Sequence, residues 1–465
     1  MTDRRRPANR ASSTPQQRRR ALANEQRLIA LGEAVDRRTG APARAKQTKQ
    51  SGQSRILSRL PLIGGLTRRA QISVVSAVVA VAVIAGFLGG GYLYAQWRFG
   101  QIHKITVGSE VQPISGQPFN ILSVGSDSRV GLSGAAAHQT GATSGAVAGQ
   151  RSDVVKIIHV DPIKGSISVL SIPRDTLVTL LANQSLYGKF NRINVNFGNG
   201  PTLVAQTITA NFGIPLNNTI VVSFGGLINA ATAVGGVRLN FPYPAADPYS
   251  GLRVSHAGCQ LVTGFEALAV ARSRHFYYNI AGHGVWPGNN TPDSVLYADG
   301  WRYDGSSDFG RIKRQDAFLN ALLIRAKHLY NPISLNAFLS ALPQGIQLDS
   351  NFSLNELIGL ALRFHGISPS SIHYYTMPTI AATAPGVGDV LFVNQPAAQE
   401  MLVNVFGSQL QSPTNPPPNT ALQTPMPPVV TTTTAAPSGS SSSSVATTAT
   451  TVPVDQNSSF NPTPC

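Results

Sequence analysis

Arginine and aspartate side chains recur at the ends of the predicted strands and helices of this 465-residue chain. A guanidinium group presents parallel N–H donors to phosphate oxygens, and several such groups can orient a diphosphate. Neither a Ser-His-Asp order nor a nucleophilic cysteine accompanies them, so we expect a polyanion site suited to phosphoryl transfer. The candidate residues are Asp127, Arg129, Arg151, Asp153, Arg174, Asp175, Arg272, Arg274, Asp308, Arg311, Arg314 and Gln315.

Two aspartates of this set could hold a metal ion. Asp127 follows a predicted strand within the GSDSR sequence at 125–129, and Asp153 begins another strand within the RSD sequence at 151–153. Carboxylates are hard oxygen ligands, so both could share Mg²⁺ with a bound diphosphate. Simpler alternatives stand beside this one: an Asx turn at Asp127, and a surface ion pair between Arg151 and Asp153 on one face of a strand.

Arg272 and Arg274 constrain the local backbone. Residues two apart on a helix point about 200° away from each other, whereas in an extended chain they share a side. If both arginines serve one site, the helix before them must end near Ala271. Further along the chain, Asp308 suits a helix N-cap, and Arg311 and Gln315 lie one turn apart on one helical face. Solvation of a helix would explain any one of these residues alone.

Strand and helix signals alternate through the part of the chain that carries these residues, which predicts helices layered on a mixed sheet. We therefore expect an α/β fold with a mixed central β-sheet sandwiched by helices. The predicted strands are 119–124, 154–160 and 166–172, with a hairpin loop at 161–165. Helices are predicted at 201–212, at 227–234 and, from capping boxes, after Thr263 and Ser353.

Positive charge is concentrated in the first 69 residues. They hold 17 Lys+Arg against 4 Asp+Glu, whereas the other 396 residues carry 20 against 17. The rest of the chain is thus nearly neutral, and the basic tail contains no folded nucleic-acid-binding motif. We therefore expect no specific nucleic-acid partner. A charged fraction of 12% and a hydrophobic fraction of 42% exclude wholesale disorder.

Cys259 and Cys465 are the only cysteines in the sequence, which excludes a disulfide scaffold. Whether these two cysteines pair with each other stays open.

An uncharged segment, residues 72–95, separates the basic tail from the rest. Its 24 residues as a helix would span about 36 Å, enough to cross a bilayer. Cations before the segment and the aromatic residues Tyr92, Tyr94 and Trp97 near its end predict that the N-terminus lies inside the cell. The alternatives are a buried core helix and a cleaved signal peptide, for which the upstream tail is too long.

These signals divide the chain into five segments. They are a disordered basic cytoplasmic tail (1–69), a transmembrane helix (70–97), a linker (98–116), an extracellular α/β domain (117–400) and a disordered Pro/Thr/Ser-rich tail (401–465). Gly86 and Gly90 have the spacing of a helix-dimer face, so a homodimer through this helix is a further hypothesis, against the ordinary small-residue content of membrane helices.

Seven ordered motifs resemble the LytR-CpsA-Psr family of cell-envelope phosphotransferases. They are NILSVGSDSR (120–129), RSDVVKIIHVDP (151–162), SVLSIPRDT (168–176), KFNRINVNFGNG (189–200), AVGGVRL (233–239), AGCQLVTGFEALAVARSR (257–274) and DFGRIKRQ (308–315). The composition resembles actinobacterial members. Two insertions, 131–150 and 275–307, are longer than the spacing in the family; the second carries His275, His283, Trp286 and Trp301 and is either a substrate-facing loop or decoration.

The resemblance implies an enzyme that transfers a glycopolymer, with a phosphate, from a polyprenyl-pyrophosphate carrier to a muramyl hydroxyl of peptidoglycan, outside the cytoplasmic membrane. In an actinobacterial member the cargo would be an arabinogalactan-type polymer. Two other classes stay open: a membrane-bound transcriptional regulator of envelope genes and a non-catalytic module that binds polyprenyl lipid.

Carried over by position, the family's site assigns a role to each candidate residue. Asp127 and Asp153 would hold Mg²⁺ or Mn²⁺, the pyrophosphate would be gripped by Arg151, Arg174, Arg272, Arg274 and Arg311, and further substrate contacts would come from Arg129, Asp175, Asp308, Arg314 and Gln315, with Asp308 orienting Arg311. An apolar pocket between sheet and helices would receive the prenyl chain, and an aspartate of this group would serve as general base.

Overall fold

The computed structural model describes residues 68–108, 116–129, 132–140, 152–282, 284–326, 332–364, 368, 371–418, 424–425 and 460–465. Arg151, His283, most of the insertion at 131–150 and the basic tail before residue 68 lie outside these ranges. The chain divides into two units, 1–85 and 86–465. The described part of the first unit is the beginning of helix α2.

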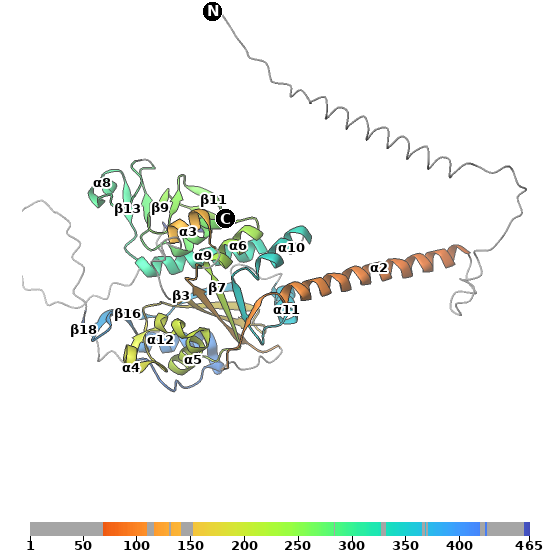
Figure 1. The fold of residues 1–465 in the computed structure, drawn as a ribbon, viewed down its shortest axis with the longest axis horizontal. Coiled ribbons are helices and arrows are strands. Elements are labelled where there is room, and N and C mark those ends of the chain that lie inside the picture. Colours follow the sequence, from red (N-terminus) through yellow and green to blue (C-terminus); the bar gives the residue numbers. More distant parts are fainter. Residues whose placement is uncertain are drawn as a thin grey trace, which may run out of the picture. The chain divides into compact units, whose positions relative to one another are not determined.

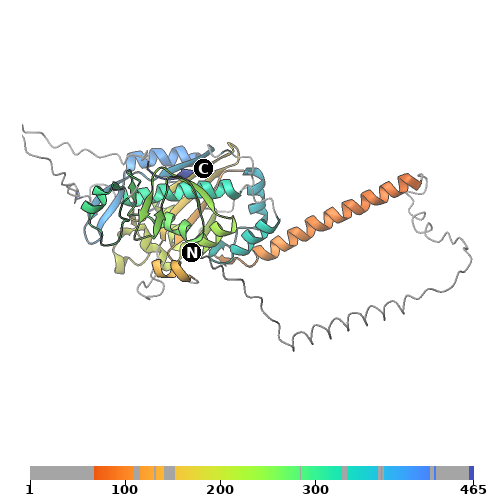
Figure 2. The same cartoon turned by 90° about the horizontal axis from the view of Figure 1, so that it is seen from above.

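The helix predicted over 72–95 is present as α2 (Arg68–Phe99), one continuous helix of 32 residues (Figures 1 and 2). Among the residues that the structure describes, no helix combines the length and the hydropathy that crossing a membrane requires.

The second unit is built on a mixed seven-stranded sheet with the strand order β1-β14-β7-β2-β3-β4-β15. Strands β3 and β7 of this sheet are labelled in Figure 1. The β1–β14, β7–β2 and β4–β15 pairs are parallel, and the remaining neighbours are antiparallel. The sheet strands are β1 (His103–Ile105), β2 (Phe119–Ser126), β3 (Ser152–Asp161), β4 (Ser166–Ile172), β7 (Asn218–Ser223), β14 (Ile346–Asp349) and β15 (Ile372–Thr376). The mixed central sheet predicted from the sequence is confirmed.

Helices cover both faces of this sheet. Successive side chains of a strand point to opposite faces, so a strand with apolar residues on both faces needs cover on each. On one face, Val155 and Ile157 pack in a core with α5 and α12. On the other, Val154 and Lys156 line a cavity beneath α6, α7 and α9. The helices and 3₁₀ turns of the second unit are α3 (Gly134–Thr140), α4 (Gln184–Tyr187), η2 (Ile193–Asn199), α5 (Pro201–Phe212), α6 (Phe224–Ala233), α7 (Gly264–Arg272), α8 (Asp293–Ala298), α9 (Ser307–Ala326), α10 (Pro332–Ala341), α11 (Leu354–Phe364), α12 (Gln395–Phe406) and η4 (Gly407–Gln409).

Local signals place several helix ends where the sequence predicts them. In both capping boxes the glutamate accepts from the backbone N–H of the cap residue, at 3.2 Å for Thr263 and 2.7 Å for Ser353. Helix α5 ends at Gly213, whose φ of +68° favours glycine. A Cβ at Gly213 would also collide with the backbone carbonyl of Gln411, so this glycine lets the segment after α12 lie against α5.

Smaller sheets stand beside the central one. They are β10-β9-β12-β13, β11-β8-β19, β17-β16-β18 and β5-β6. Their strands are β5 (Leu177–Thr179), β6 (Phe190–Arg192), β8 (Val237–Phe241), β9 (Ala245–Asp247), β10 (Leu252–Val254), β11 (Gly258–Val262), β12 (Tyr277–Asn279), β13 (Trp301–Tyr303), β16 (Thr379–Ala384), β17 (Gly388–Val393), β18 (Thr424–Pro425) and β19 (Thr463–Pro464).

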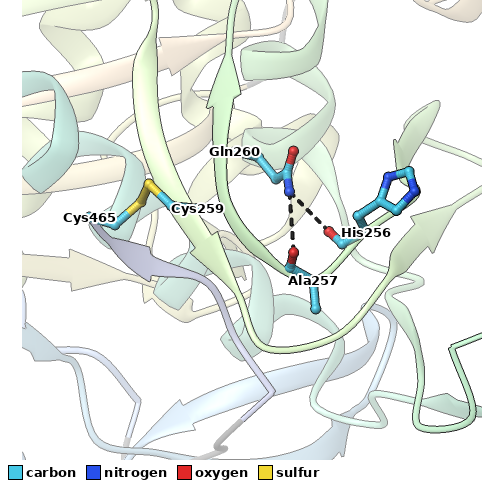
Figure 3. Close-up of a disulfide and its surroundings, with 5 residues drawn as sticks. All are labelled: His256, Ala257, Cys259, Gln260 and Cys465. Carbon is cyan, nitrogen blue, oxygen red and sulfur yellow. Dashed lines mark hydrogen bonds between the residues drawn. A yellow bond between two sulfur atoms is a disulfide. The ribbon is translucent and has the colours of Figure 1, made fainter.

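The last residues of the chain belong to the fold. Strand β19 pairs with β8, and Cys465 forms a disulfide with Cys259 on β11 (Figure 3). Beside the disulfide, Gln260 donates to the carbonyls of His256 and Ala257 at 3.2 and 3.4 Å (Figure 3). The cysteine pairing that the sequence leaves open is therefore made.

Two predicted boundaries are wrong. The segment 98–116 is not only a linker, because its residues 103–105 form edge strand β1 of the central sheet. Residues 401–465 are not wholly a disordered tail: α12 continues to Phe406, the backbone N–H of Asn415 donates to Ala210 at 2.9 Å, and β19 pairs with β8. These contacts join segments far apart in the chain, which composition alone does not reveal. Residues 426–459 lie outside the described ranges.

Candidate active site

Ends of three elements meet at one edge of the central sheet. Asp153 stands at the start of β3, Arg174 follows β4, and Arg311 lies in the first part of α9. Arg174 Nη1 pairs with Asp153 Oδ1 at 2.7 Å, and Arg311 Nη2 donates to the backbone carbonyl of Asp153 at 2.7 Å. One aspartate thus fixes two arginines that are 137 residues apart in sequence, counted from 174 to 311.

Asp308 joins a fourth element to this group. Its carboxylate lies 3.2 Å from Arg274 Nε and 2.8 Å from Arg311 Nη2. The orienting role predicted for Asp308 toward Arg311 agrees with this geometry, although α9 begins at Ser307, so Asp308 lies within the first turn and not at the cap. We call Arg174, Arg272, Arg274, Arg311, Asp153 and Asp308 together the arginine cluster.

Helix α7 ends between the two arginines, Arg272 and Arg274. Its last residue is Arg272, and Ser273 has an extended backbone with φ −63° and ψ 116°. Arg272 lines the cavity with Arg311, while Arg274 pairs with Asp308. The helix end that the Arg272 and Arg274 spacing requires is therefore present, one residue beyond Ala271.

Some guanidinium donors of this region are buried without an acceptor. Within the described residues, Nη1 of Arg272, Nε of Arg311 and Nε of Arg129 have no hydrogen-bond partner. Arg272 also stacks over the ring of Phe224, with 5.2 Å between Cζ and the ring centroid. A buried donor left unpaired costs about 1–3 kcal/mol. A bound anion would satisfy these donors.

The electrostatics of the arginine cluster favour an added negative charge. Burial alone would raise the pKa of Asp153, but the guanidinium groups of Arg311 and Arg174 outweigh it and hold that pKa below its usual value. Burial lowers the pKa of Arg272 and Arg311, opposed by Asp153 and, at Arg311, also by Asp308. Guanidinium groups stay protonated in proteins, so four cations face two carboxylates.

An apolar cavity of about 220 Å³ opens beside the arginine cluster. Asp153, Arg272, Arg311 and Gln315 line its charged side. Its apolar lining comes from the central sheet and from helices α6, α7 and α9, and the helices contribute Phe224, Leu227, Leu268, Phe318, Leu319 and Leu322. A ligand with an anionic head and a hydrocarbon chain matches both sides of this cavity.

The two predicted metal ligands lie at the ends of neighbouring strands: Asp127 directly follows β2, and Asp153 is the second residue of β3. Ser126 pairs with Ser152 across the antiparallel strands β2 and β3, so Asp127 continues beyond this pair in one direction and Asp153 leaves it in the other. The described residues contain no group of three or more metal-ligating side chains. Mg²⁺ is commonly held by one or two carboxylates together with substrate phosphates and water. The carboxylate of Asp153 within the arginine cluster therefore fits a cation that arrives with a diphosphate, and Asp127 follows the end of the neighbouring strand.

Not every predicted site residue faces the cavity. Arg314 is fully buried at 0% exposure and binds Asp304 at 2.8 Å and Asn461 at 2.7 Å, so direct contact with substrate does not fit its position. Gln315 lines the cavity and donates to the carbonyl of Ala271 at 2.9 Å. Asp175 lies 3.5 Å from Arg174 and 3.6 Å from Arg192, at the margin of the cluster.

Sequence reasoning misses the groups that support the arginines. Asp247, fully buried, accepts from Ser273 Oγ at 2.7 Å and from the backbone N–H groups of Arg274 and His275 at 2.8 and 2.9 Å. On the cavity wall, Lys156 pairs with Asp316 at 2.6 Å. Burial raises the pKa of Asp316, and Lys156 opposes that effect. Asp316 directly follows the DFGRIKRQ motif, which was the available signal for it.

The chain belongs to the LytR_cpsA_psr family, whose family model matches residues 99–279 and 296–406. The unmatched residues 280–295 fall inside the longer of the two insertions identified in the sequence. The resemblance inferred from the seven motifs is therefore confirmed.

Three individual relatives share between 19% and 31% sequence identity with this chain. The chain is 31% identical over 241 residues to the probable cell wall biosynthesis protein LcpB of Corynebacterium glutamicum, a match that covers 49% of this chain and 55% of LcpB. The polyisoprenyl-teichoic acid–peptidoglycan teichoic acid transferase TagV of Bacillus subtilis is 25% identical over 307 residues, covering 63% of this chain and 67% of TagV. A LytR-Csp2A-Psr enzyme structure from Actinomyces oris matches at 19% identity with a TM-score of 0.48, covering 68% of this chain and 99% of that one.

Proposed function

We propose that this protein is a membrane-anchored phosphotransferase that moves a glycopolymer from a polyprenyl-pyrophosphate carrier to a muramyl hydroxyl of peptidoglycan. The observation that carries the proposal is Arg272, whose buried Nη1 lacks an acceptor among the described residues and which lines an apolar cavity. The pyrophosphate would accept from this donor and from Arg311, and the prenyl chain would enter the cavity. TagV, a relative, carries the name of a transferase acting between a polyisoprenyl-linked polymer and peptidoglycan.

In this proposal the acceptor hydroxyl oxygen attacks the phosphorus that bears the glycan. A new P–O bond forms to the muramyl oxygen, the P–O bond to the bridging oxygen breaks, and polyprenyl phosphate leaves. The hydroxyl proton passes to a carboxylate of the site. Arg174, Arg272, Arg274 and Arg311 neutralise the charge that builds on the phosphoryl oxygens. Asp127 and Asp153 would hold Mg²⁺ or Mn²⁺, which supplies further charge neutralisation when bound.

We assign the catalytic domain to the outer face of the cytoplasmic membrane. The Cys259–Cys465 disulfide supports this location, because structural disulfides are rare in the reducing cytosol. The uncharged segment 72–95 and the basic residues before it support an N-terminus inside the cell. An arabinogalactan-type polymer is the proposed cargo. A topology reporter fused after Trp97 tests the location: activity of a cytoplasmic reporter at that position would exclude wall chemistry.

Transfer of a labelled lipid-linked glycan to peptidoglycan by the purified full chain tests the reaction. Arg174→Ala should reduce the rate at least 100-fold, because it removes a cation from the phosphoryl site. Arg238→Ala, which changes an exposed arginine on β8, is the matched control and should transfer at the wild-type rate. If Arg174→Ala transfers as fast as the control, the enzymatic proposal is wrong and a lipid-binding module becomes the better interpretation.

A further inference from the structure

Four aromatic rings form a continuous row on the β10-β9-β12-β13 sheet and its flanking loops. Ring centroids are 4.5 Å apart from Tyr249 to His275, 6.3 Å from His275 to Tyr303 and 5.1 Å from Tyr303 to Tyr277. Tyr277 and Tyr303 are direct cross-strand partners on β12 and β13. We call these four residues the aromatic row.

The aromatic row is accessible to solvent. Tyr249 is 54% exposed, His275 is exposed, and Tyr277 and Tyr303 are half-buried. The apolar core under this sheet, formed by Ala246, Leu296 and Trp301, takes up part of Tyr277 only. The row therefore presents aromatic surface that the described fold does not use for packing.

The buried carboxylate of Asp247 accepts hydrogen bonds from the backbone of both the aromatic row and the arginine cluster. Asp247 Oδ1 accepts from the backbone N–H of Tyr249 at 2.9 Å, and Asp247 Oδ2 accepts from the backbone N–H groups of Arg274 and His275 at 2.8 and 2.9 Å. Arg274 in turn pairs with Asp308. His275, the second residue of the row, thus directly follows Arg274 of the arginine cluster, and Asp247 fixes the backbone of both residues.

The chemistry of the row suits a sugar better than a hydrocarbon chain. Aromatic faces carry partial negative charge and attract the C–H groups on the flat face of a pyranose, while the phenol hydroxyls can bond to sugar hydroxyls. Burial raises the pKa of Tyr277 and Tyr303, reinforced by nearby Asp293 at Tyr277 and by Asp304 at Tyr303, so both phenols stay protonated at neutral pH. The Tyr277 hydroxyl donates to Asp293 Oδ1 at 3.2 Å, so its oxygen can accept a hydrogen bond from a sugar hydroxyl. In the proposed function the prenyl chain occupies the leucine-lined cavity beneath α6, α7 and α9, so the aromatic row is not needed to bind it.

On the basis of the proposed function, we propose that the aromatic row is a glycan subsite that stacks the first sugar residues attached to the donor's pyrophosphate. A glycan leaving the arginine cluster past Arg274 meets His275 and Tyr249 directly. The subsite would fix which phosphorus faces the acceptor, because it binds the sugar-bearing end of the donor and not the lipid end.

Two probes test this inference on the full-length chain in detergent: geranylgeranyl pyrophosphate, and the same lipid carrying an N-acetylglucosamine trisaccharide. The wild type should bind the glycosylated probe more tightly. Tyr249→Ala should weaken binding of that probe about three- to tenfold and leave binding of the sugar-free probe unchanged, whereas Tyr249→Phe should keep the wild-type preference. Tyr187→Ala, at a tyrosine 41% exposed on α4, is the matched control and should change neither affinity.

Three results would overturn the subsite. If the wild type binds the two probes with equal affinity, the aromatic row is not a glycan subsite. The same conclusion follows if Tyr249→Ala keeps the wild-type preference for the glycosylated probe. Equal weakening of both probes by Tyr249→Ala would make the row a support for the arginines only. In each case geranylgeranyl pyrophosphate still binds and the proposed function stands. A wild type that binds neither probe overturns both proposals.

Discussion

The side-chain carbonyl of Asn461 accepts a 2.7 Å hydrogen bond from Nη1 of Arg314, a residue 147 positions earlier in the chain. Both side chains are buried. Nη2 of the same guanidinium donates to the carbonyl of Ser273 at 3.1 Å. Since Ser273 separates Arg272 from Arg274, the end of the chain supports the loop that carries two members of the arginine cluster.

Asn461→Ala should lower the free energy of unfolding by about 1–2 kcal/mol, because Nη1 of the buried Arg314 then keeps only Asp304 as a partner among the described residues. It should also weaken binding of geranylgeranyl pyrophosphate through the Ser273 loop. Urea unfolding and a binding titration measure the two effects. Asn415→Ala, at an exposed asparagine, is the control. An Asn461→Ala protein indistinguishable from it in both measurements would rule out this supporting role.

Removing the disulfide should destabilise the protein. The Cys259–Cys465 bond closes a loop with a sequence separation of 206 residues, and loss of such a cross-link commonly costs about 2–4 kcal/mol. Thermal unfolding of the Cys259→Ser, Cys465→Ser double variant should show the loss. Reducing agent should lower the unfolding temperature of the wild type toward that of the variant and leave the variant unchanged; an equal response of both proteins would contradict the prediction.

Two glycines in helices should respond to alanine in opposite ways. A Cβ at Gly310 on α9 would collide with Ser306 Oγ and Asp304 Oδ2 and would press on Arg314, whereas a Cβ at Gly359 on α11 would meet no atom within 4 Å. Gly359→Ala should therefore stabilise the fold by up to about 1 kcal/mol through helix propensity. Gly310→Ala should destabilise it by about 1–3 kcal/mol through strain. Urea midpoints that move in the same direction would show that α9 has room for the methyl group.

Arg272→Met should separate stability from binding. The substitution removes a cation with an unpaired buried donor, so the unfolding free energy should stay constant or rise by about 1 kcal/mol. Geranylgeranyl pyrophosphate should raise the unfolding temperature of the wild type and fail to raise that of the variant. A stabilised variant that still responds to the ligand would show that Arg272 does not hold the anion. Arg238→Met controls for the loss of a cation.

The acid dependence of stability should contain a contribution from Asp153. Its pKa in the folded protein lies below the ordinary value, so the ionised carboxylate stabilises the fold at neutral pH, and this stabilisation is lost as pH falls through the folded pKa. The difference in unfolding free energy between wild type and Asp153→Asn should be largest near pH 7 and shrink toward pH 3. Asp389→Asn, at an exposed aspartate of β17, is the control. If the difference in unfolding free energy does not change with pH, Asp153 stabilises the fold through packing and not through its charge.

Features with local causes were predictable from the sequence. The hairpin between β3 and β4, the Gly213 helix end and the break after Arg272 each follow from a few adjacent residues. The common face of Arg311 and Gln315 follows from helical spacing, and both line the cavity.

Features that depend on distant partners were not predictable. Arg314 carries the same charge as Arg311 three residues earlier, yet its burial is decided by Asp304 and Asn461, which no local pattern joins to it. The same holds for edge strand β1, whose pairing with β14 links residues more than 240 positions apart. Only the folded chain shows that Arg272 and Arg311 line the cavity whereas Arg314 pairs with buried groups of the framework.

The anchoring of both flanks of the segment 426–459 bears on how the protein would respond to proteolysis. β18 pairs with β16 before this segment, and β19 pairs with β8 after it, with Cys465 bonded to Cys259. A protease that cuts between these flanks would produce a nicked, two-chain protein in which the terminal peptide stays covalently attached. Asn461 would then keep its contact with Arg314, so cleavage in this segment would leave the support of the Ser273 loop in place until a reductant releases the fragment.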